Sequence, residues 1–150
     1  MIQNTQGTYQ PGRFIREVQE EVVANSSTVV GEYLRDHVYT PFETFDQEEM
    51  YILLLNSRLR ITHEVMIYRG TVSCIAVRPA EIFKEAVRLN VPSLILAHNH
   101  PSGDPTPSAE DILITSRLKQ GALLLDLKFF DHLIVGEKSW VSMKELNLGF

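Results

Sequence analysis

The chain has 150 residues, a hydrophobic fraction of 44% and a formal net charge of −5, values typical of one globular domain rather than a disordered chain. No apolar run approaches the about 20 residues that a membrane helix needs, the N-terminus lacks the pattern of a secretory signal, and the single cysteine, Cys74, excludes an internal disulfide, so we expect a cytoplasmic protein. The acidic balance and the scattered lysines and arginines disfavour a nucleic-acid binder, because such proteins gather positive charge to neutralise phosphates.

The first part of the chain carries the weakest pattern. Residues 1–25 are polar, and we expect an N-terminal arm there, either extended and disordered or a frayed helix. Residues 26–150 are expected to form the domain. Two serines precede the segment 28–39, whose apolar residues follow helical spacing, so a helix is predicted there until Pro41 ends it.

The middle of the chain favours strands. Three apolar or mixed segments are interpreted as strands: residues 50–56, 61–70 and 71–77. A turn at 58–60 separates the first two, and Gly70 separates the last two. Cys74 lies in the third segment and is interpreted as a small buried hydrophobe rather than a nucleophile. Pro79 then suits the first position of a helix over 80–90.

The last third alternates between the two kinds of element. We expect strands over the segments 93–98, 127–136 and 140–143. A loop rich in proline, serine and glycine spans 100–108 and leads into a helix over 109–121. This order of elements predicts a mixed α/β (α+β) fold, with a central mixed β-sheet flanked by helices rather than a regular alternation of strand and helix.

The end of the strand at 93–98 carries the most informative motif. His98 and His100 are two residues apart, so on an extended chain their imidazoles project to the same side. Ser108 and Asp111 are three apart at the start of the following helix, so they share a helix face. Two histidines and one carboxylate are a common ligand set of catalytic zinc sites, which leave a fourth position open for water. His98, His100 and Asp111 are therefore candidate metal ligands.

Each of these residues also has an ordinary structural interpretation. Two histidines can lie two apart by chance, and Ser108 with Asp111 resembles the capping box of a helix N-terminus. Alternatively, Thr106 caps the helix and Pro107 is its first residue. The register of strand, loop and helix favours the metal site over these separate interpretations.

The residues also carry a resemblance to a known family. The pattern H-x-H-x7-S-x2-D matches the JAMM motif of MPN-fold metallopeptidases, and the segments GTVSCIAVRPAEIFKEAVRLNVPSLILAHNHPSGDPTPSAED and DHLIVG resemble the RadC family, over roughly residues 28–145. The resemblance implies an MPN/JAB-type fold, a Zn2+ ion held by His98, His100 and Asp111, and a role for Ser108 in stabilising the oxyanion. It also implies a short form without the helix-hairpin-helix region of longer relatives.

The resemblance further implies an upstream glutamate that acts as general base. Glu48, Glu49 and Glu64 are available, and alternation does not decide because the strand at 50–56 is apolar on both faces. Glu64 lies within the next strand, where an outward, solvated face is the simpler interpretation. The RadC pattern favours Glu48, because its acidic residue comes eight before the Asp or Asn that ends the first strand, here Asn56.

Two functions compete at this point. One is a zinc-dependent metallopeptidase or isopeptidase with a peptide or protein substrate. The other is a non-catalytic metal-binding module that acts with DNA or a DNA-repair partner, which the historical label of the family, DNA repair protein, supports and the charge balance disfavours. His132 is interpreted as a packed histidine or as a hydrogen-bond partner of a metal ligand. His37 and His63 are interpreted as ordinary surface or half-buried histidines.

Overall fold

Seven strands form one sheet in the computed structural model, which describes residues 7–10, 13–70 and 77–150. Among the described strands, β5 and β6 form the only parallel pair, so the sheet is mixed, as predicted. Across the sheet, the strands are β1 (Gly7–Gln10), β2 (Arg13–Glu17), β4 (Ile61–Gly70), β3 (Glu48–Leu55), β5 (Ser93–Asn99), β6 (Lys128–Val135) and β7 (Trp140–Ser142).

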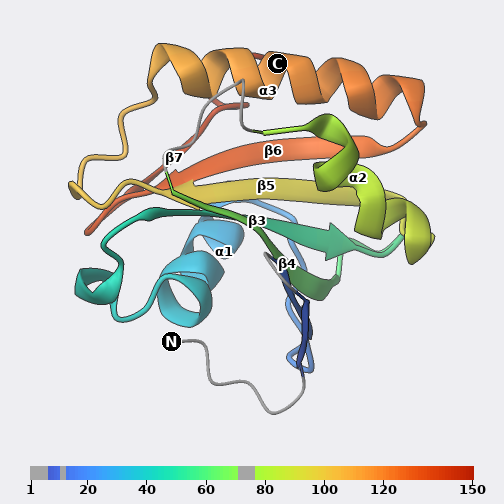
Figure 1. Ribbon diagram of the computed structural model, residues 1–150, viewed down its shortest axis with the longest axis horizontal. Coiled ribbons are helices and arrows are strands. Elements are labelled where there is room, and N and C mark those ends of the chain that lie inside the picture. Colours follow the sequence, from blue (N-terminus) through green and yellow to red (C-terminus); the bar gives the residue numbers. More distant parts are fainter. Residues whose placement is uncertain (1–6, 11–12, 71–76) are drawn as a thin grey trace.

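Helices cover both faces of this sheet (Figure 1). On one face lie α2 (Pro79–Arg88) and α3 (Ala109–Leu124), which bury Phe83 and Leu118 against the even-numbered side chains of β3. On the other face lie α1 (Ser27–Tyr33) and the π-helical turn η1 (Leu34–Val38), packed on the odd-numbered side chains of β3. A short 3-10 turn, η2 (Phe42–Thr44), leads into β3. The predicted α+β fold class is confirmed.

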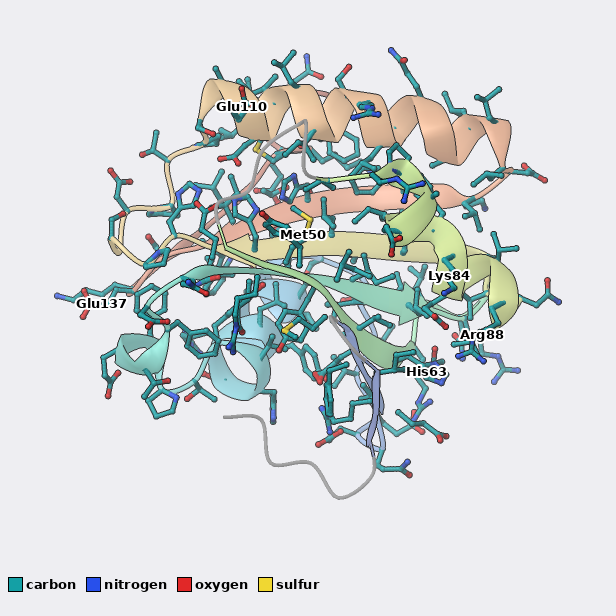
Figure 2. The ribbon with its side chains drawn as sticks, in the orientation of Figure 1. Met50, His63, Lys84, Arg88, Glu110 and Glu137 are labelled. Carbon is teal, nitrogen blue, oxygen red and sulfur yellow. The ribbon has the colours of Figure 1, made fainter. Side chains whose placement is uncertain are left out.

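The two apolar faces of β3 explain why its segment reads as a continuous hydrophobic run. Every residue from Glu49 to Leu55 is buried, because the strand lies inside the sheet between the two helical layers. The register with β5 is regular over this stretch and places Met50 opposite His98. Side chains directly opposite each other share a face, so His98 lies on the α3 side of the sheet together with Met50, which is labelled in Figure 2.

The helix predicted over 28–39 is present, with a change of winding partway. Ser26 caps α1, since its hydroxyl oxygen accepts a hydrogen bond from the Val29 N–H at 3.2 Å. Gly31 is required where α1 meets β7, because a Cβ there would lie 2.1 Å from the ring of Trp140. The final turn, η1, is π-helical and ends before the predicted stop at Pro41.

The N-terminal part differs from one of the two expectations for residues 1–25. Residues 7–10 and 13–17 are strands, so the frayed-helix alternative is wrong for those residues. Phe14 in β2 and Val18 just after it are buried, and β2 pairs with β4, whose residues come about fifty positions later. Pairing with a strand so distant in sequence stabilises a segment whose local pattern is weak. The boundary at residue 26 stays a prediction.

The strand predicted over 71–77, together with Cys74, falls on residues outside the described ranges, apart from the buried Val77. Elsewhere the expected elements differ from the observed ones only by a few residues at their ends. In the part of the chain that the structure describes, no helix is both long enough and apolar enough to cross a bilayer.

Candidate metal centre

Three segments meet at one end of the sheet, on the left in Figure 1. They are the end of β5, the loop and first turn of α3 that follow it, and the start of β3. Glu110, labelled in Figure 2, marks this first turn of α3. The candidate ligands His98, His100 and Asp111 come from the first two segments, and Glu48 comes from the third.

The three predicted ligands converge on one point. The Nε2 atoms of His98 and His100 are 3.1 Å apart, and the carboxylate oxygens of Asp111 lie 3.2 Å from the first and 3.3 Å from the second. Around a zinc ion with bonds of about 2.0–2.1 Å, two ligand atoms of a tetrahedron are separated by about 3.3 Å. The donor set and its spacing therefore fit a zinc ion.

Glu48 completes a group that could hold a metal ion. Ligand atoms of Glu48, His98 and His100 all lie within 4.8 Å of one another, and Glu48 Oε1 is 3.9 Å from His100 Nε2. His98 is fully buried, whereas Glu48 and His100 are half-buried. The site therefore has a buried floor and a side toward solvent, where a water or a substrate could approach.

The orientation of His100 follows from the loop that carries it. Its Nδ1 lies 2.9 Å from the carbonyl oxygen of Asp104, which can only accept, so Nδ1 carries a proton and Nε2 faces Asp111. The Asp111 carboxylate, to which only the protonated ring can donate from Nε2, raises the pKa of His100. The backbone of the loop is fixed in turn by the strand end of β6, because the His100 N–H donates to Val135 O at 2.9 Å.

Asp111 belongs to the helix cap and to the candidate site at once. The Ser108 hydroxyl oxygen accepts from the Asp111 N–H at 3.1 Å, and the Ser108 N–H donates to Asp111 Oδ2 at 2.8 Å. The capping box offered as an ordinary interpretation is thus present, and the cap at Thr106 is not used. Burial alone would raise the pKa of Asp111, but the interaction of its carboxylate with the His100 and His98 imidazoles outweighs the burial and lowers that pKa. The carboxylate is therefore held ionised, beside the imidazoles.

The structure separates the three glutamates by face. Glu48 shares the α3 face with His98, two residues before Met50. Glu49 points to the opposite face and forms an ion pair with Arg69, in which Arg69 Nε lies 2.7 Å from Glu49 Oε1. Alternation alone could not decide between them, but the register with β5 does.

Glu64 is a correction to the sequence interpretation. It was expected to be solvated, but it is 5% exposed and lies on the α1 face, opposite Leu53. Arg16 from β2 donates two hydrogen bonds to its carboxylate, at 2.7 and 3.0 Å, and the Tyr33 hydroxyl donates a third at 2.5 Å. An arginine from a strand that the sequence did not predict compensates the buried charge.

Two buried side chains, His132 and Thr115, form a chain of contacts that ends at His98 Nδ1. His132 Nε2 lies 2.8 Å from His98 Nδ1, and Thr115 Oγ1 lies 2.7 Å from His132 Nδ1. Burial lowers the pKa of His132 well below its ordinary value. Of the two interpretations offered for His132, contact with a candidate ligand is the one observed. Thr115 was not singled out; its signal in the sequence is its position four residues after Asp111, one helical turn further along α3.

Asn99 is a second residue whose role the local sequence does not indicate. Its side chain is buried on the far side of β5 from the histidines that flank it. Its Oδ1 accepts from the Glu49 N–H at 2.6 Å, and its Nδ2 donates to Gln47 O at 3.1 Å. Asn99 therefore fixes the backbone on both sides of Glu48.

The remaining histidines lie away from this centre. His37 is exposed and stacks on Tyr33, with ring centroids 5.1 Å apart, and His63 is half-buried in β4 at the other end of the sheet, as Figure 2 shows. Both agree with their ordinary interpretation.

Comparison with known proteins agrees with the resemblance to the RadC family. The family described as RadC-like JAB domain matches residues 24–148. A UPF0758 protein of Roseiflexus castenholzii is 45% identical over 105 residues, and one of Chloroflexus aurantiacus is 47% identical over the same length; each alignment covers 70% of this chain. A UPF0758 protein of Clostridium botulinum is 50% identical over 99 residues, or 66% of this chain. The chain spans less than half of these relatives, between 43% and 46% of their length.

Proposed function

We propose that this chain, which belongs to the family of RadC-like JAB domains, is a zinc-dependent hydrolase of the metallopeptidase or isopeptidase type. One observation carries the proposal: the convergence of His98 Nε2, His100 Nε2 and the Asp111 carboxylate, separated by 3.1 to 3.3 Å. Three protein ligands with an open fourth position are typical of catalytic zinc, whereas structural zinc takes four protein ligands.

The kind of metal follows from the donor set. Imidazole nitrogens suit zinc and other late transition metals, and a single carboxylate added to two imidazoles is a frequent hydrolytic zinc site. Calcium and magnesium prefer an all-oxygen shell, which two histidines do not supply. Zinc, when bound, would act as a Lewis acid on the scissile carbonyl and lower the pKa of a coordinated water toward about 7.

Glu48 and Ser108 would supply the rest of the chemistry. Glu48 lies on the open side of the site, where its carboxylate can take a proton from the attacking water and pass it to the leaving amine. The Ser108 hydroxyl already accepts from the Asp111 N–H, so its own hydrogen is free to point at a developing oxyanion. Ser108 is exposed at the start of α3, within reach of an incoming substrate.

The substrate proposed for this site is a peptide or a protein, and a cytoplasmic location is proposed from the single cysteine. The relatives extend well beyond the aligned region, so activities of a longer protein enter here only as proposals. DNA or a DNA-repair protein as a partner has weaker support, because the net charge is −5.

Metal content tests the proposal first. Purified protein reconstituted with zinc should hold about one zinc ion per chain, measured by inductively coupled plasma mass spectrometry. His98→Ala and Asp111→Ala should each lose this ion. His63→Ala is the matched control, since it removes a half-buried histidine at the other end of the sheet and should keep the metal. One zinc per chain in both site variants would overturn the assignment.

Cleavage of a fluorogenic peptide set and of an isopeptide-linked lysine peptide tests the reaction. We expect hydrolysis that a chelator abolishes and added zinc restores, with the circular dichroism spectrum unchanged because the two apolar cores are independent of the metal. Zinc binding without any hydrolysis, joined to tight salt-sensitive DNA binding, would favour the non-catalytic module.

A further inference from the structure

The buried contacts behind His98 define the direction of each hydrogen bond. Thr115 Oγ1 lies 2.7 Å from the carbonyl oxygen of Asp111 and 2.7 Å from His132 Nδ1. A carbonyl oxygen can only accept, and a hydroxyl has a single hydrogen to give. The Thr115 hydroxyl therefore donates to Asp111 O and must accept from His132, so the proton of His132 is on Nδ1.

The next contact then has only one direction as well. With its proton on Nδ1, the neutral His132 presents a lone pair at Nε2, which lies 2.8 Å from His98 Nδ1. We propose that Thr115 and His132 are positioning residues that fix neutral His98 in the tautomer with its proton on Nδ1, so that the neutral ring offers the lone pair of Nε2 to the metal.

The tautomer of His100, the second candidate ligand, is fixed in the same way by a different group. His100 Nδ1 faces the carbonyl oxygen of Asp104 at 2.9 Å, so in the neutral ring the lone pair is on Nε2. The two lone pairs then face each other at 3.1 Å, an arrangement that is repulsive by itself and favourable around a cation. Two independent carbonyl anchors, Asp104 O and Asp111 O, thus impose the same tautomer on both histidines.

The hydrogen bonds from Thr115 through His132 to His98 are shielded from solvent. His98, Thr115 and His132 each have 0% exposure, so bulk water cannot supply a substitute partner if one member is removed. Partners of metal-ligating histidines typically contribute 10- to 100-fold to metal affinity or activity. Asp111 takes part at both ends, since its carboxylate faces the metal position and its carbonyl anchors Thr115.

Nitrogen-15 NMR of the histidine rings in metal-free protein tests the tautomers directly. Long-range proton–nitrogen spectra at neutral pH should show His98 and His132 both protonated on Nδ1. A proton on His132 Nε2 in the wild-type protein would overturn the inference. The inference rests on the proposed metal site for its purpose, but this measurement contains no zinc, so its failure is distinct from a failure to bind zinc or to cleave a peptide.

Variants at Thr115 test the consequence for the metal. Thr115→Val keeps the shape and removes the hydroxyl, so we expect a mixture of His132 tautomers and zinc affinity about 10- to 100-fold lower in competition with a chelator. Thr115→Ser restores the hydroxyl and should recover both readouts.

Thr62→Val is the matched control, because the Thr62 hydroxyl also donates to a backbone carbonyl, Leu54 O at 3.2 Å, at the far end of β4. Thr62→Val should leave the tautomers of His98 and His132 and the zinc affinity unchanged, although the Thr62 hydroxyl also contacts His63. Wild-type affinity and tautomers in Thr115→Val would overturn the inference, and if that variant does not fold, the wild-type tautomers still decide.

Discussion

The two faces of β3 carry the same acidic residue type in adjacent positions and use it differently. On the α1 face, Glu49 pairs with Arg69, and nearby Glu64 pairs with Arg16. On the α3 face, Glu48 lies beside the imidazole of His100. The carboxylates of the first face meet guanidinium groups, which are always charged and offer no lone pair to a cation. The carboxylate of the second face meets imidazoles, which when neutral offer lone pairs to a cation.

This difference shows why a perturbed pKa is a poor guide to the functional site here. The hydrogen bond with Glu64 raises the pKa of Arg16, and burial raises the pKa of Tyr33, although both residues belong to a buried ion-pair cluster on the α1 face. Structural ion pairs shift pKa values as strongly as catalytic groups do. What distinguishes the α3 face is the kind of partner: it brings together groups that a metal ion could bridge.

Neutralising the adjacent glutamates one at a time tests the different roles of the two faces of β3. Glu48→Gln should keep zinc and fold but lower peptide cleavage by about 10²- to 10⁴-fold, the usual contribution of a general base. Glu49→Gln, on the other face, should leave cleavage close to the wild-type rate. Zinc content and steady-state kinetics of the two variants measure this.

The reverse result would move the base to Glu49. A loss of zinc in Glu48→Gln would instead make Glu48 a ligand, in keeping with the short distances within the group Glu48, His98 and His100. Glu49→Gln also serves as the control for placing an amide in β3.

Removing Glu64 should have the second largest effect, on stability rather than on metal binding. Glu64→Ala leaves Arg16 without its main partner, and Arg16 is only 15% exposed. Breaking a buried pair in this way costs about 3–5 kcal/mol. Urea denaturation should show this loss, while the zinc content of the folded protein stays unchanged. Loss of zinc in Glu64→Ala would mean that the two faces are coupled.

The α3 face could be largely predicted from sequence, because its site is local. His98, His100, Ser108 and Asp111 lie within fourteen consecutive residues, and strand alternation and helix spacing bring them to one place. The fold class followed from the order of segments.

The helix of the α1 face was predicted, but the ion pairs of that face could not be, because they depend on pairings between distant segments. The partner of Glu64 comes from β2, 48 residues earlier, in a segment without a clear pattern. The register that places Glu48 on the α3 face, with Met50 opposite His98, likewise joins two strands that the local sequence does not align. Asn99 and His132 acquire their contacts through such pairings, and Thr115, whose bond to Asp111 O is local, meets His132 only in the folded protein.

The loop that carries His100 can be displaced without touching any charged group. Gly136 lies against it, and a Cβ at this position would be 2.3 Å from the carbonyl oxygen of Gly103, a backbone atom that cannot move cheaply. Gly136→Ala should therefore cost about 1–3 kcal/mol and weaken zinc binding. Calorimetry with and without zinc measures both effects.

Gly121→Ala is the matched control on the same face. The atom nearest to its added Cβ would be on the edge of the Phe83 ring at 3.0 Å, a side-chain atom rather than a backbone atom. It should keep full zinc affinity. Unchanged zinc binding in Gly136→Ala would show that the loop tolerates the shift.

Asn99 joins the two faces of the sheet. This side chain is buried, yet it fixes the backbone on both sides of Glu48, which lies on the α3 face. Asn99→Ala leaves the Glu49 N–H without its acceptor, at a cost of about 1–3 kcal/mol.

Asn56→Ala is the matched control. The Asn56 side chain accepts from two backbone N–H groups in the β3–β4 turn, so Asn56→Ala should cost a similar amount of stability. Only Asn99→Ala should also slow cleavage, by up to about 10²-fold, because Glu48 loses its fixed position while the zinc ligands stay in place. Equal rates in the two variants would mean that β3 holds Glu48 without Asn99, and that each face acts alone.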